Sequence, residues 1–113
     1  MYGGKSQRLP EKGWAVAEVF ITPLGTGQPT VRDYVRAVYE VARASGMKHQ
    51  LTAMGTLLEG RVEDILDLVR RMHEACFEAA GGTQRVVTSL RLDELRGEPL
   101  TLEGKVRGVS GEP

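Results

Sequence analysis

Two glycine–threonine turns, each beside a short apolar run, most constrain how this 113-residue chain can fold. The first is Thr22-Pro23-Leu24-Gly25-Thr26-Gly27, and the second is Met54-Gly55-Thr56-Leu57-Leu58-Glu59-Gly60. Glycine permits backbone conformations that a Cβ forbids, and it lets a ligand approach the main chain closely. We therefore expect the two turns to contribute to a single site.

Composition excludes several classes of protein. The length permits one domain with one core. Fifteen Lys+Arg balance fifteen Asp+Glu, so no field favours nucleic acid or an anionic membrane. The single cysteine, Cys76, excludes an intrachain disulfide and a multi-cysteine metal site, and it fits a reducing cytoplasm. Residues 1–13 lack the apolar segment of a signal peptide, and no apolar run approaches the roughly 20 residues of a membrane helix. We expect a cytoplasmic protein without a metal, a cofactor, or a nucleic-acid or membrane partner.

Hydrophobic periodicity predicts four strands and two main helices. An apolar, largely β-branched run predicts a strand that ends at Pro23. Thr30 is the expected N-cap of the first helix, and Gly46 is its expected left-handed cap. A hairpin, a second helix that stops at Gly81-Gly82, and a last strand follow. The expected ranges are 14–22, 30–46, 47–53, 56–60, 63–80 and 85–93, with a short amphipathic helical piece within 100–109.

This order, β-α-β-β-α-β, is that of ferredoxin-like folds. It predicts an α+β domain over residues 14–109, with a four-stranded antiparallel sheet and two helices on one face. Residues 1–13 are expected to be a flexible extension and residues 110–113 a frayed tail. Right-handed crossovers put the first and third strands side by side. The end of the first strand, the Met54–Thr56 turn, the amino end of the first helix and Arg85 are therefore expected to meet at one edge.

The alternation of the first strand divides the sheet into two faces. Ala15, Ala17, Val19 and Ile21 are expected under the helices. The opposite, open face is expected to hold an apolar patch with two acids and a base, from Val16, Glu18, Phe20, Leu57, Glu59, Ser89 and Arg91. A patch of this kind favours a covering partner, and a second copy of the chain is the simplest one.

Glu18 and Glu59, on neighbouring central strands, are the main chemical signal. One interpretation is an ion pair with Arg91 between subunits, because buried acids are usually paired. The other is a pair of acceptors for a cationic or amine-bearing ligand, held in a low-dielectric pocket between subunits.

The motifs of the chain resemble those of the small thiamine-binding protein family over nearly the whole domain. The matching segments are Ala17-Glu18, Thr22 to Gly27, Thr52 to Gly60, His73-Glu74-Ala75 and Arg85 to Asp93. Ala53 departs from the pattern, because proline is common there in the family. The resemblance implies a ferredoxin-like subunit that assembles into dimers or dimers of dimers. It also implies binding of thiamine or its hydroxymethylpyrimidine portion rather than catalysis.

The ligand role carries over onto the residues that match the family motifs. These are Glu18, Phe20, Thr22, Leu24, Gly25, Thr26, Met54, Gly55, Thr56 and Glu59. An enzyme is disfavoured because no nucleophile–base pair is apparent. An RNA-binding module is disfavoured because Phe20 alone, in a neutral chain, is a poor stacking platform. A structural or regulatory homo-oligomer without a small-molecule ligand stays as the alternative.

Overall fold

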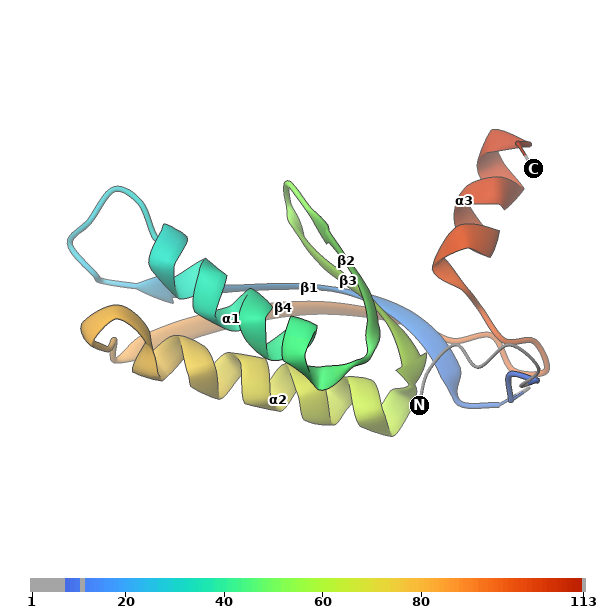
Figure 1. Ribbon diagram of the computed structural model, residues 1–113, viewed down its shortest axis with the longest axis horizontal. Helices are drawn as coiled ribbons and strands as arrows, with labels where there is room; N and C mark the ends of the chain where they lie inside the picture. Colours follow the sequence, from blue (N-terminus) through green and yellow to red (C-terminus); the bar gives the residue numbers. More distant parts are fainter. Residues whose placement is uncertain (1–7, 11, 113) are drawn as a thin grey trace.

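The computed structural model describes residues 8–10 and 12–112 and has the predicted ferredoxin-like α+β architecture (Figure 1). Most of the expected 1–13 extension, and Pro113 of the expected tail, lie outside the described residues. The elements are β1 (Trp14–Leu24), α1 (Arg32–Ser45), β2 (Lys48–Thr52), β3 (Gly55–Arg61), α2 (Val62–Glu78), the 3-10 turn η1 (Ala79–Gly81), β4 (Arg85–Asp93) and α3 (Leu102–Ser110).

The four strands form one antiparallel sheet in the order β2-β3-β1-β4. Helices α1 and α2 lie on one side of this sheet, while α3 stands on the other side at one end (Figure 1). The two central strands are β3 and β1, as the sequence predicts. The strand order therefore leaves β4 and β2 as the two edges.

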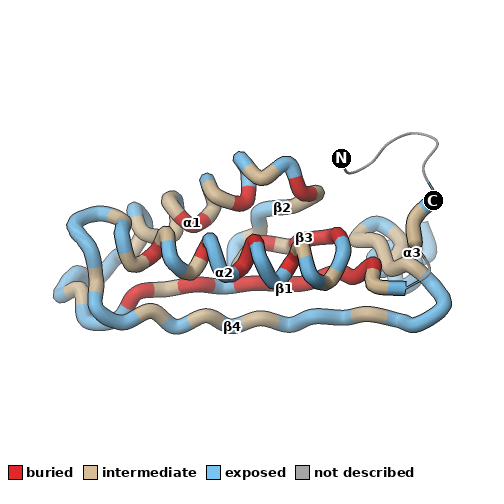
Figure 2. Tube along the Cα trace, turned by 90° about the horizontal axis from the view of Figure 1, so that it is seen from below, coloured by how far each residue is buried: buried red, intermediate tan, exposed pale blue. Residues whose placement is uncertain are grey.

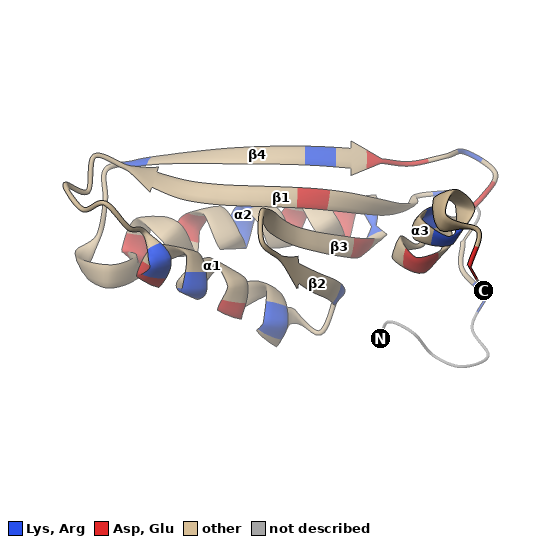
Figure 3. Cartoon of the chain, turned by 90° about the horizontal axis from the view of Figure 1, so that it is seen from above, with Lys and Arg blue, Asp and Glu red and all other residues tan. Residues whose placement is uncertain are grey.

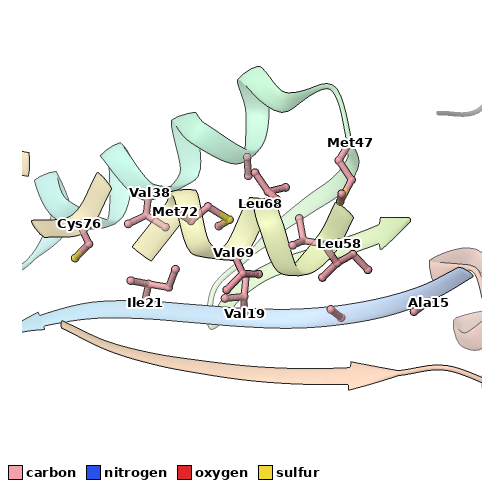
Figure 4. Close-up of a cluster of buried hydrophobic side chains, with 13 residues drawn as sticks. Ala15, Val19, Ile21, Val38, Met47, Leu58, Leu68, Val69, Met72 and Cys76 are labelled. Atoms are coloured by element: carbon pink, nitrogen blue, oxygen red, sulfur yellow. The ribbon is translucent and has the colours of Figure 1, made fainter. Parts of the chain in front are cut away.

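The two faces of β1 are those predicted from its alternation. Ala15, Ala17, Val19 and Ile21 are all buried against the helices. Helix α2 supplies most of the opposing side chains, among them Leu68 and Met72, and the whole cluster fills the space between sheet and helices (Figure 4). Burial is continuous along most of β1 and sparse along β4 (Figure 2). The core is therefore centred on one strand.

The ends of α1 partly follow the sequence prediction. Gly46 caps the helix in the left-handed region, with φ 79°. The N-cap prediction is wrong by one position, because the N-cap is Val31, which makes no side-chain cap. Thr30 precedes the N-cap by one residue, and its hydroxyl accepts a hydrogen bond from the backbone N–H of Arg32 at 3.3 Å.

The expected meeting of four segments at one edge is only partly found. The first turn of α1 does reach this edge, because the Tyr34 hydroxyl donates to the backbone oxygen of Gly82, shortly before β4. Leu24 lies opposite Arg85, so the end of β1 and the start of β4 do meet. Thr56, however, lies opposite Val19, five positions earlier in β1. At roughly 3.3 Å per residue this separates the Met54–Thr56 turn from that edge by about 17 Å. The expectation is wrong for this turn because β3 is much shorter than β1.

Gly55 is needed where β3 begins beside β1. A Cβ on this residue would lie 2.7 Å from the backbone oxygen of Val19, which cannot move without disturbing the central strand. We predict that Gly55→Ala destabilises the fold by about 1–3 kcal/mol, as overpacking typically does. Urea denaturation measures the change.

Gly108 provides the matched control for that substitution. It lies in α3 without a positive φ, and a Cβ added to it would meet open space. Gly108→Ala is therefore expected to be neutral or to stabilise the protein by up to about 1 kcal/mol through helix propensity. Equal stabilities of the two variants would contradict the close approach at Gly55.

Candidate functional site

A cavity of about 530 Å³ lies between the open face of the sheet and α3. Its walls combine apolar side chains with acids and bases, from Val16, Ala17, Glu18, Gln50, Leu57, Arg91, Leu92, Asp93, Leu102, Lys105 and Val106. Figure 3 shows an acidic segment of β1 beside a basic segment of β4 on this side of the molecule. The cavity therefore has both an apolar floor and charged groups that can orient a ligand.

Glu18 is an acid of this cavity that lies on a central strand and retains access to a ligand. It lies opposite Leu57 of β3 and Arg91 of β4. Its Oε1 is 3.7 Å from Nη1 of Arg91, and the two side chains are 41% and 87% exposed. An exposed pair at this distance contributes about 0–1 kcal/mol. The ion pair with Arg91 that one interpretation places between subunits thus forms within one chain for Glu18, and it leaves room beside the carboxylate.

Glu59 is on the same face but has a different environment. Its side chain is only 4% exposed. The indole Nε1 of Trp14 donates to its Oε2 at 3.0 Å, and the backbone N–H of Leu102 donates to its Oε1 at 2.9 Å. Lys48 Nζ lies 3.5 Å from Oε1. Glu59 therefore joins the start of β1 to the first residue of α3.

Further polar contacts hold the first turns of α3. The Thr101 hydroxyl accepts from the backbone N–H of Gly104 at 3.0 Å and caps the helix. Lys48 contacts Glu103 at 2.5 Å. Burial disfavours the charged form of Lys48, but its hydrogen bond to Glu103 and its two acidic neighbours raise its pKa overall. The same hydrogen bond lowers the pKa of Glu103. Both shifts favour the charged pair that holds α3.

The other residues expected at the site fall into separate places. Phe20 is 43% exposed and follows Glu18 by two positions on the open face, as Thr22 follows Phe20. Met54 is 77% exposed at the hairpin turn. Gly55 and Thr56 border a small cavity of about 70 Å³ next to α1, and Phe20 is the third expected residue that lines it.

The three expected residues at the end of β1 lie elsewhere. Leu24, Gly25 and Thr26 line another cavity, of about 550 Å³, with Tyr34 and Arg85. Neither this cavity nor the small one has a lining residue in common with the Glu18 cavity. The structure therefore does not bring the expected set together in one cavity of a single chain.

Sequence reasoning missed the residues that anchor α3. The sequence assigns Trp14 only to a strand, and it assigns Leu102 and Lys105 to a short amphipathic piece with no stated partner. The sequence shows that Trp14 begins the first strand and that Leu100–Val109 is amphipathic. Neither observation identifies Glu59 as the residue that both segments contact.

The described residues contain no group of three or more His, Cys, Asp or Glu that could hold a metal ion. Cys76 is buried in the core, and burial raises the pKa of its thiol, which disfavours the nucleophilic thiolate. His73 Nδ1 lies 2.6 Å from the hydroxyl of Thr88 and links α2 to β4. Among the helices that the structure describes, none is long and apolar enough to cross a membrane.

These features define a ferredoxin-like α+β domain whose open sheet face carries a cavity bordered by the helix α3. The chain belongs to the thiamine-binding protein family, whose model matches residues 17–110.

Relatives and solved structures agree with this assignment. UPF0045 protein YqgV of Bacillus subtilis is 40% identical over 100 residues, which are 85% of this chain and 94% of the relative. The crystal structure of a hypothetical protein from Methanocaldococcus jannaschii has a TM-score of 0.79 at 35% identity, covering 88% of this chain and 99% of that chain. A candidate thiamine biosynthesis/salvage protein from Thermotoga maritima shares the fold at a TM-score of 0.72 and 22% identity, covering 84% and 97%.

The contacts of Glu59 predict a substitution effect on α3. In Glu59→Gln one of the two carboxylate acceptors becomes an amide NH₂, so Trp14 or Leu102 loses its acceptor. A buried donor left without a partner costs about 1–3 kcal/mol. We expect that loss in urea denaturation, together with faster hydrogen exchange at the Leu102 amide.

The matched control is Glu18→Gln, which changes a carboxylate on the same face. Because the Glu18 pair is exposed, its loss should cost no more than about 1 kcal/mol and should leave Leu102 exchange unchanged. Unaltered exchange at Leu102 in Glu59→Gln would show that Glu59 does not anchor α3.

Proposed function

We propose that the protein binds thiamine, its hydroxymethylpyrimidine portion or a related cationic aminopyrimidine, without catalysing a reaction. The observation that carries the proposal is Glu18, an accessible carboxylate in a cavity of about 530 Å³ that has apolar walls. This volume is in the usual range for small-molecule sites, about 300–1,000 Å³. Membership of a family described as thiamine-binding supports the same ligand class.

The chemistry of the cavity suits such a ligand. Thiamine has a permanently cationic thiazolium and an aminopyrimidine that donates hydrogen bonds. Glu18 can balance the charge or accept from the amino group through a charge-assisted hydrogen bond. Val16 and Leu57 lie on either side of Glu18 in the open face and provide apolar surface for a flat ring. Phe20, next along β1, can extend that surface by stacking.

Glu59 is not among the contacts that we propose for the ligand, because the anchor of α3 already uses both of its oxygens. Its contribution is indirect, since Leu102 and Val106 of α3 form one wall of the cavity. The proposal therefore rests on one acid rather than the expected two. The single cysteine supports a cytoplasmic location for this binding.

The substitution Glu18→Gln tests the proposal. A hydrogen bond to a charged group contributes about 1.5–3 kcal/mol, so the variant should bind thiamine at least about tenfold more weakly. For the native protein, thiamine at about 100 times its dissociation constant should add about 2.7 kcal/mol of stability. Thermal-shift measurements with thiamine, its phosphates and hydroxymethylpyrimidine compare these ligands.

Glu74→Gln is the matched control, because Glu74 is exposed on α2, on the other side of the sheet. It should bind thiamine as the native protein does. Absence of stabilisation by every one of these compounds would remove the ligand-binding proposal and favour the structural or regulatory homo-oligomer.

We also propose that a second copy of the chain covers the part of the open face that α3 leaves bare. Phe20 is 43% exposed there and Val87 41%, on neighbouring strands. On α3, Val106 is 67% and Val109 is 91% exposed. Exposed apolar side chains gathered on one side of a small domain favour an isologous contact.

Sedimentation velocity tests this self-association. The native protein should be a dimer or a dimer of dimers, and Phe20→Ser combined with Val87→Ser should shift it toward the monomer. Leu66→Ser is the control, because Leu66 is 46% exposed on α2 and lies outside the proposed contact. A native monomer at micromolar concentration would overturn the proposal.

A further inference from the structure

A second sizeable cavity, of about 550 Å³, lies at the far end of β1 from α3. It is lined by the end of β1 and the connection after it, by α1, and by the start of β4 and the connection before it. The residues are Leu24, Gly25, Thr26, Tyr34, Gly82, Thr83, Gln84 and Arg85. None of these residues lines the cavity beside Glu18. Leu24 is six positions beyond Glu18, which is about 20 Å along a strand. The two cavities are therefore separate sites.

The electrostatic character of this second cavity is simple. Arg85 is the one charged residue among the described residues that line it. Arg85 is exposed, and its guanidinium makes no salt bridge with any residue that the structure describes. The Glu18 cavity differs, because acids accompany both of its bases. The Arg85 cavity thus presents an uncompensated positive group to a ligand.

The walls of the cavity are tied together across long sequence separations. The Tyr34 hydroxyl donates to the backbone oxygen of Gly82 at 2.8 Å, which joins α1 to the segment after α2. The Thr83 hydroxyl donates to the backbone oxygen of Leu24 at 3.2 Å. Figure 1 shows the β1–α1 and α2–β4 connections at the same end of the molecule. A cavity held in this way costs little to organise when a ligand enters.

The donors and the size of the cavity define the ligand class. A guanidinium matches the oxygens of a phosphate bidentately, and it is the usual side chain where planar recognition of an oxyanion is needed. The Gln84 amide is a further donor on the same rim. Leu24, which is 40% exposed, and the ring of Tyr34 add apolar surface. The space exceeds what an inorganic phosphate fills.

We propose that this cavity binds the phosphate of a small phosphate monoester, with Arg85 as the main contact and the organic group against Leu24 and Tyr34. This site is independent of the proposed thiamine site. It is built from different residues, and it has the opposite charge preference.

Titration of the full chain with phenyl phosphate, followed by amide NMR shifts, tests the site. Phenyl phosphate should shift the amides of Gly25, Thr26 and Thr83, and phenol should not. Inorganic phosphate should shift the same amides but bind more weakly, because it lacks the organic group. Arg85→Gln should weaken phenyl phosphate binding at least tenfold, while Arg85→Lys should bind with intermediate strength.

Arg61→Gln is the matched control. It removes the same charge at the opposite end of β1, where Arg61 lies beside Trp14, and it should bind phenyl phosphate as the native protein does. Equal binding by Arg85→Gln, or shifts confined to residues of the Glu18 cavity, would overturn the site. Equal affinity for inorganic phosphate and phenyl phosphate would overturn the monoester assignment. Thiamine stabilisation should be the same in Arg85→Gln and the native protein, so the two proposals fail or survive separately.

Discussion

The unequal pairing of β1 is the constraint on which the rest of the structure depends. This strand pairs with β3 only over Trp14–Val19, but with β4 over Val16–Leu24. Its first half is therefore central to the sheet, and its second half extends beyond the β2–β3 hairpin. Along its whole length, one set of side chains fills the core under α1 and α2. The other set is divided between an end covered by α3 and an end left open.

The unequal pairing of β1 with β3 and β4 also explains why the candidate binding residues lie in separate cavities. The Glu18 cavity forms where β1 has a neighbour on each side and α3 above it. The Arg85 cavity forms where β1 has passed the hairpin and reaches the connection before β4. The strand β1 thus borders two cavities of different charge, and the partly exposed Phe20 lies between them.

The sequence predicts the element order, the strand faces and the left-handed cap at Gly46, because each depends on local periodicity or local conformation. The sequence is less informative about the ends and lengths of the strands, because tertiary contacts determine these. Pro23 indicates the end of the first strand, yet β1 continues to Leu24. Proline is tolerated there because, among the described strands, β1 pairs only with β4 at that point. The length of β3, which sets this unequal pairing, has no comparable local signal.

The different roles of Glu18 and Glu59 could not be predicted either. Both acids lie on the open face, as the alternation of the strands predicts, but burial without partners would be costly for each. Glu59 is buried because Trp14, Lys48 and Leu102 converge on it, and Leu102 is 43 positions away in the chain. Glu18 instead lies beside an exposed arginine at 3.7 Å. Periodicity assigns a side chain to a face, but not to the donors that surround it.

The contact between Trp14 and Glu59 has a practical consequence for experiments. Trp14 is the single tryptophan of the chain, and its indole nitrogen bonds to the carboxylate that also holds α3. Its fluorescence therefore reports on the environment of the Trp14–Glu59 hydrogen bond, and no added dye is needed. A molecule or partner that displaces α3 or holds it more firmly is expected to change the emission maximum or the intensity of Trp14 fluorescence. The protein therefore contains an intrinsic probe of this helix.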